Sequence, residues 1–116
     1  MKRLFPLFAF VLFFNCSGTV PSSSSAEEAL LGAELNYENS NIVLLVVSKG
    51  CTAKQDFTLQ MKEGKLLVTR KKKDECKMMP FAARITWTFA EAGIKPNKPF
   101  YILNPFISNP LTADLQ

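Results

Sequence analysis

Histidine is absent from the 116 residues of this sequence. Its absence removes the commonest general base, the commonest zinc ligand and every catalytic triad that depends on imidazole. The 5 glycines are scattered, so there is no glycine-rich loop of the kind that cradles phosphates. The chain therefore lacks the usual parts of a catalyst, and we expect no enzymatic activity, no metal and no cofactor.

An excess of charge of one sign is also largely missing. The formal net charge is +4, but without Lys2 and Arg3 the 14 basic residues fall to 12, against 10 acidic ones. Nucleic acid is therefore not an expected partner. With 47% apolar and 21% charged residues, the chain suits one small globular domain, in which a covalent cross-link would matter for stability.

The N-terminal segment has the pattern of an export signal. Lys2 and Arg3 precede an apolar run at residues 4–14. Such a run is too short to span a bilayer as a helix but suits the core of a signal peptide. A stretch rich in serine follows, which predicts a flexible tether rather than a folded element.

The end of this run, Leu12-Phe13-Phe14-Asn15-Cys16-Ser17, resembles the lipobox of bacterial lipoprotein precursors. Bulky residues before the cysteine match the relaxed form found in spirochaetal lipoproteins. The resemblance covers the N-terminus only. It implies that Cys16 becomes the lipidated first residue and anchors the chain in the cell envelope, with the outer membrane as the expected membrane. The alternative is ordinary secretion, with cleavage near Gly18 or Ala26.

The cysteine count supports the lipoprotein interpretation independently. An exported chain with 3 cysteines has one left over after pairing. If Cys16 carries lipid, Cys51 and Cys76 remain as a pair. They lack the C-x-x-C spacing of a redox or zinc motif, so we predict a structural disulfide.

Residues 57–70 predict a β-hairpin. Apolar residues alternate on either side of Glu63-Gly64, which we interpret as a two-residue turn. That turn places Met61 opposite Leu66. It also places Leu59 opposite Val68.

Continued further, the same register places Cys51 directly opposite Cys76. Because side chains alternate with a period of two, Cys51 would then share the face of Phe57, Leu59 and Met61. Cα atoms in such a pair lie about 4.5 Å apart, which permits a disulfide.

The remaining segments give the other elements. Residues 42–47 predict a central strand, 85–89 a strand buried on one face, and 100–103 a last strand. Residues 27–35 can form a short helix, with Ser25 as N-cap and Glu28 completing a capping box. Residues 77–83 are expected to be irregular, and 90–94 to form a turn or helical loop.

These elements predict a mainly β fold: a small antiparallel sheet or β-sandwich of about five strands, stapled by one disulfide. Besides the 42–47 strand, the expected core is Phe57, Leu59, Met61, Val68, Ile85, Trp87, Phe89, Phe100 and Ile102. The expected organisation is a signal peptide at 1–15, the lipidated cysteine and tether at 16–27, the β domain at 28–105 and a loose tail at 106–116.

Arg70, Lys71, Lys72 and Lys73 form the one dense like-charge run after residue 15 and are the candidate binding surface. Asp74 and Glu75 follow and should temper it. The other interpretation is a solvated hairpin end whose charges discourage edge pairing. Asp56, Asp74 and Glu75 are candidate acid–base groups, but we expect them to cap or flank turns.

Over about residues 42–105, the sequence is similar to small exported bacterial domains of uncharacterised activity. The similarity is carried by Gly50-Cys51-Thr52, Asp56-Phe57, Arg70, Asp74 and Cys76, followed by the Trp87 strand. The similarity implies no particular activity. The sequence therefore predicts a lipid-anchored envelope protein acting as a non-catalytic binding or structural module. Its expected partners are the membrane, through the lipid, and an envelope protein or anionic surface. The alternative is a small secreted enzyme with a carboxylate site.

Overall fold

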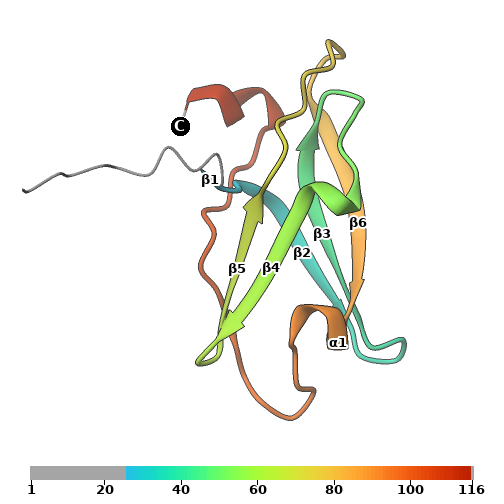
Figure 1. The fold of residues 1–116 in the computed structure, drawn as a ribbon, viewed down its shortest axis with the longest axis vertical. Helices are drawn as coiled ribbons and strands as arrows, with labels where there is room; N and C mark the ends of the chain where they lie inside the picture. The colour runs from blue at the N-terminus through green and yellow to red at the C-terminus, as the bar shows by residue number, and fades with distance from the viewer. Residues whose placement is uncertain (1–25, 116) are drawn as a thin grey trace, which may run out of the picture.

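The computed structural model describes residues 26–115, which form two facing β-sheets (Figure 1). One sheet has the order β2-β3-β6; in the other, β5 is flanked by β4 on one side and by β1 and β7 on the other. The strands are β1 (Ala26–Glu27), β2 (Leu30–Asn36), β3 (Asn41–Ser48), β4 (Phe57–Lys62), β5 (Lys65–Arg70), β6 (Phe81–Thr88) and β7 (Tyr101–Ile102). The mainly β fold with one disulfide is confirmed.

β3 is the central strand of its sheet, as its run of β-branched residues and leucine predicts. Ile42, Leu44 and Val46 are fully buried between the sheets, whereas Val43 and Leu45 on the other face are half-buried. An ion pair between Glu34 of β2 and Arg84 of β6 connects the strands on either side of β3.

The helix predicted over 27–35 is wrong. This segment forms β1 and β2, and β2 pairs with β3 along its length. An isolated helix of this size is marginal, whereas pairing satisfies the backbone of β3 and buries Leu30 completely. Gly32 suits this pairing because a Cβ there would lie 2.8 Å from Leu45 Cδ1. The capping interpretation of Glu28 fails too, because its carboxylate binds Arg70 instead.

The hairpin register is confirmed: β4 and β5 pair with Met61 opposite Leu66 and Leu59 opposite Val68. Glu63 and Gly64 have φ values of 54° and 74°, as a two-residue turn with left-handed central residues requires.

The extension of this ladder to the cysteines is wrong, although the disulfide itself is present. The ladder ends at Phe57 opposite Arg70, and the short 3₁₀-helix η1 (Lys54–Asp56) precedes β4. Residues 49–56 have to carry the chain from one sheet to the other, so they cannot also extend the hairpin. Cys51 is consequently exposed in a loop, and its Cα lies 5.7 Å from that of Cys76.

The core lies between the sheets, where Phe57 of β4 packs edge-on against Trp87 of β6, with ring centroids 6.0 Å apart. Of the predicted core residues, Phe57, Val68, Ile85, Trp87 and Phe89 are buried, and Leu59, Met61, Phe100 and Ile102 are partly buried against them. Leu30, Leu66, Ala92 and Ile94 also belong to the core and were not predicted.

The last strand differs in direction from the antiparallel arrangement that we expected. β6 begins at Phe81, earlier than predicted, and is followed by α1 (Phe89–Ala92) in the predicted helical loop. Thr88 caps this helix, and Gly93 ends it with φ 72°. The connection then returns the chain to the turn end of the hairpin, so β7 runs parallel to β5 rather than antiparallel.

The segment predicted as a loose tail makes contacts with the sandwich. The amide of Leu30 donates to Pro105 O, and the amide of Ile107 donates to Leu30 O. A 3₁₀-helix, η2 (Pro110–Leu115), follows.

Asn104 completes the edge of β5 between the two short strands. β1 pairs with residues 69–70 and β7 with residues 65–66, which leaves Val68 between them. The Val68 amide donates to Asn104 Oδ1 (2.8 Å), and Asn104 Nδ2 donates to Val68 O (2.6 Å) and Glu28 O (2.8 Å). The buried side-chain amide of Asn104 thus makes the hydrogen bonds to Val68 that the backbone of a neighbouring strand would otherwise make.

Replacing Asn104 with alanine should lower the free energy of unfolding by about 2–3 kcal/mol, because it leaves the buried Val68 amide without an acceptor. Denaturant unfolding of the full chain measures this. Asn97→Ala is the matched control, since Asn97 is exposed in a turn. Equal unfolding midpoints for the two variants would show that Asn104 does not hold this edge.

Candidate functional site: the disulfide-held loop between β5 and β6

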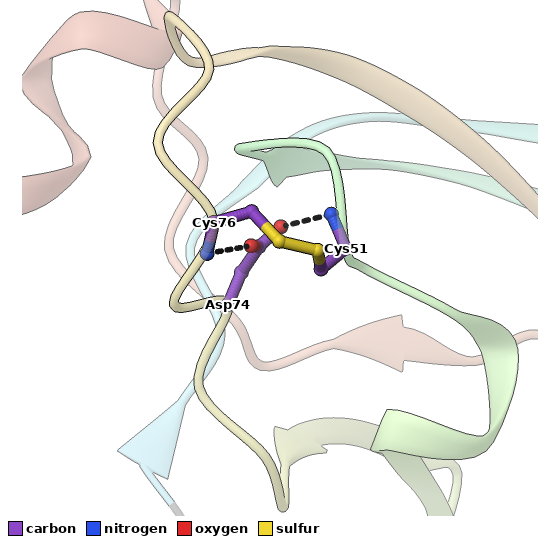
Figure 2. Close-up of side chains that lie close together, drawn as sticks. All are labelled: Cys51, Asp74 and Cys76. Carbon is purple, nitrogen blue, oxygen red and sulfur yellow. Dashed lines mark hydrogen bonds between the residues drawn. A yellow bond between two sulfur atoms is a disulfide. The ribbon is translucent and has the colours of Figure 1, made fainter.

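The candidate site is the β5–β6 loop, residues 71–80, which contains the charged run that the sequence singles out. It leaves the end of β5 and extends past the end of β3 before entering β6 (Figure 1). The disulfide between Cys76 and Cys51 ties it to the loop that follows β3 (Figure 2). The amide of Lys71 also donates to Asp56 O, and the amide of Met78 to Lys49 O.

Asp74 lies beside the disulfide and accepts hydrogen bonds from both of the loops that it joins. Its Oδ1 accepts from the Cys76 amide at 3.0 Å, and its Oδ2 from the Cys51 amide at 3.1 Å (Figure 2). Oδ2 also accepts from the Lys49 amide at 2.7 Å. One carboxylate therefore satisfies three backbone donors in segments without regular secondary structure.

Two hydroxyl groups complete the environment of Asp74. Thr52 Oγ1 donates to Oδ2 at 2.6 Å and Ser48 Oγ at 3.3 Å. Burial alone would raise the pKa of Asp74. The hydrogen bonds from the Thr52 hydroxyl and from the amides of Lys49, Cys76 and Cys51 outweigh it and hold the pKa well below its ordinary value.

Arg70, the first residue of the predicted binding run, is not part of the exposed surface. Its Nε and Nη2 donate to the two carboxylate oxygens of Glu28, and both side chains retain little exposure. Nη1 donates to Thr52 Oγ1 and Nη2 also to Val47 O, while the guanidinium lies over the Phe57 ring. The Arg70 side chain thus connects the residue that follows β1 with β3 and β4 at one end of the sandwich.

Lys71, Lys72 and Lys73 are exposed, as expected of a binding surface and of a solvated hairpin end alike. The structure adds a feature that the sequence reasoning missed. Met78 is 59% exposed and Met79 77% exposed within the loop, and Phe81 at its end is 41% exposed. Lysine and apolar side chains therefore share one loop. The signal in the sequence was an apolar cluster around Pro80, which belongs to no periodic pattern.

The three candidate acid–base carboxylates do not share one role. Asp56 is buried, and its Oδ2 accepts from the Ala53 amide at 2.9 Å at the start of η1. Asp74 holds the disulfide loops together, whereas Glu75 is exposed. The expected capping role is therefore confirmed for Asp56 and Asp74.

Cys51, Asp74 and Cys76 place ligand-type atoms within 4.8 Å of one another. The two sulfurs are bonded to each other, so neither is a thiolate that could coordinate a metal. The Asp74 carboxylate is occupied by protein donors. This cluster is a cross-link rather than a metal centre.

A concave feature lies at the turn end of the hairpin. It is an open cavity of about 340 Å³ lined by Met61, Glu63, Gly64, Gly93, Lys95, Lys98, Pro99 and Phe100. Its charged side chains are all exposed. The β5–β6 loop remains the candidate site, because it carries the predicted charged run and is fixed by the disulfide.

Comparison with protein-family models, curated proteins and solved structures gives no match to this chain. No helix among residues 26–115 combines the length and apolar character needed to cross a membrane. The predicted signal peptide and Cys16 lie outside the described residues.

Asp74→Asn should lower the free energy of unfolding at neutral pH by about 1.5–3 kcal/mol, because the variant loses hydrogen bonds to a charged acceptor. The folded-state pKa is depressed, so the stabilisation is complete above the unfolded-state pKa of about 3.9 and is lost as the pH falls through the lower folded value. Unfolding measured from neutral to acid pH should therefore show the two proteins converging in acid. A difference that does not change with pH would contradict this account.

Arg70→Gln should destabilise the fold by about 3 kcal/mol, because Glu28 would keep little exposure and lose its partner. The triple change of Lys71, Lys72 and Lys73 to Gln should change stability by less than about 0.5 kcal/mol, since these side chains are exposed. Thermal unfolding of the two variants makes the comparison. Equal destabilisation would mean that the run acts as one unit.

Proposed function

We propose that this protein is a lipid-anchored protein of the bacterial cell envelope whose β domain is a non-catalytic binding module. The observation that carries the proposal is the disulfide between Cys51 and Cys76. A structural disulfide is typical of an oxidising compartment outside the cytosol. It also accounts for two of the 3 cysteines and leaves Cys16, which stands where the lipobox resemblance expects the acylated residue.

The binding role is supported by the distribution of charge in the β5–β6 loop. Lys71, Lys72 and Lys73 are exposed, while the carboxylate of the adjacent Asp74 is engaged by backbone amides and hydroxyls. The loop is pinned at Asp74, Cys76 and Met78, so its side chains are presented from a constrained backbone. A constrained loop loses less conformational entropy on binding than a free one.

The alternative of a secreted enzyme would need a pair of carboxylates free to exchange protons. Asp56 and Asp74 instead serve as acceptors for backbone amides, which favours a binding module over a carboxylate enzyme.

The lipid anchor is tested by feeding radiolabelled palmitate to bacteria that produce the full chain. We expect label in the wild-type protein and none in Cys16→Ala, because Cys16 is the proposed acylation site. The double variant Cys51→Ala/Cys76→Ala is the matched control and should keep the label. Label in Cys16→Ala would show that another residue is acylated. Unlabelled wild-type protein in the medium would favour secretion.

A further inference from the structure

We infer that the β5–β6 loop seats on an anionic phospholipid surface, with its lysines at the headgroups and Met78, Met79 and Phe81 in the interfacial layer. The inference deepens the proposed function and rests on it in one respect, namely that the N-terminal anchor holds the domain near a membrane. It concerns a contact made by the folded domain, which is separate from the anchor.

The apolar part of the contact consists of exposed side chains at the end of the β5–β6 loop, which are not part of the core. Met79 is 77% and Met78 59% exposed, and Phe81 follows directly after Pro80. Met78 is nevertheless fixed in position: its amide donates to Lys49 O, and its side chain lies against Gly50, where a Cβ would come within 2.6 Å of the Met78 sulfur. The fold therefore holds apolar groups at its surface, a feature that marks protein or membrane contact sites.

The charged part lies on the same loop. Lys71, Lys72, Lys73 and Lys77 are all exposed. Of the two carboxylates among them, Asp74 is turned toward the disulfide and the β3 loop, which leaves Glu75 as the exposed one. The loop that carries the exposed apolar groups therefore also carries an excess of cations, and such segments are attracted to anionic lipid headgroups.

The point at which the chain enters the domain is at the same end of the sandwich. β1 pairs Ala26 with Arg70, the residue immediately before the loop (Figure 1). The ion pair between Glu28 and Arg70 fixes this arrangement. The stretch between Cys16 and Ala26 lies outside the described residues, and its sequence predicts a Ser-rich tether. A flexible chain of that length would span roughly 17 Å. An anchor on Cys16 would therefore bring this end of the domain to the membrane.

The lysines of the loop suit a lipid surface better than an acidic protein. Lysine is depleted at protein interfaces, where aromatic residues, methionine and arginine are enriched. At a membrane, by contrast, lysine can lay its apolar stem along the interface and keep its ammonium group at the headgroups. The one arginine of the run, Arg70, is used inside the fold.

The experiment uses the full chain with vesicles of phosphatidylcholine alone or mixed with phosphatidylglycerol, both carrying brominated acyl chains that quench tryptophan. Met79→Trp reports contact by the loop. Tyr101→Trp is the matched control, because Tyr101 is similarly exposed, at 72%, on β7. The single native tryptophan, Trp87, is buried and gives the same background in both variants. Flotation with the phosphatidylcholine vesicles reports the anchor separately.

We expect quenching of the Met79→Trp variant on the anionic vesicles, little on phosphatidylcholine, and little quenching of Tyr101→Trp on either. Added salt should reduce the signal, because it screens the lysines. Each lysine changed to Gln within the run 71–73 should lower the equilibrium constant for seating by about fivefold.

Each other result has a separate meaning. A Met79→Trp chain that floats on both vesicles without quenching keeps the anchor and overturns the loop inference. A chain that does not float on phosphatidylcholine, yet is quenched at position 79 on anionic vesicles, supports the loop contact and overturns the lipid anchor. Equal quenching at positions 79 and 101 overturns the loop contact. A change in the emission of Met79→Trp with soluble polyglutamate, but not with anionic vesicles, assigns the loop to an acidic protein and overturns the lipid assignment.

Discussion

The carboxylate of Asp74 is the constraint on which one end of this sandwich depends, namely the end where the loops after β3 and β5 meet. It accepts hydrogen bonds from backbone amides of the loop after β3 and of the loop after β5. These two strands belong to different sheets, and the disulfide joins the same two loops covalently. Neither segment has a ladder partner of its own there. The ionised carboxylate therefore provides hydrogen bonding to amides of both loops and reinforces the covalent connection that the disulfide makes between them.

β5 has a comparable role along its length. Its outer edge is completed by β1 at one end, by β7 at the other and by the Asn104 side chain between them. This arrangement uses segments from both ends of the domain to cover one strand, and so protects an edge that could otherwise pair with another chain. It also determines that the N-terminal entry point lies beside the start of the β5–β6 loop.

The parts of this fold that follow local rules could be predicted, and the parts that depend on tertiary contacts could not. The hairpin register follows from turn chemistry at Glu63-Gly64 and alternation on both sides. The segment 27–35 was misassigned because its strand state depends on pairing with β3 and, at Glu27, with β5. The alternating pattern did indicate that Arg70 points inward. Arg70 lies on the same face of β5 as Leu66 and Val68, and the hairpin register places it opposite Phe57.

That alternation explains why four consecutive basic residues divide into two roles. Arg70 is the last residue of β5, and its side chain points inward to Glu28 and Phe57. The strand ends there, and the side chains of the following lysines are exposed to solvent. Arginine suits the inward position because its planar group can bind a carboxylate in two places and lie flat on a ring at once. Lysine suits the outward positions because it is strongly hydrated and flexible. The run is thus one charge cluster in the sequence. In the fold it is a largely covered arginine that binds Glu28, followed by three exposed lysines.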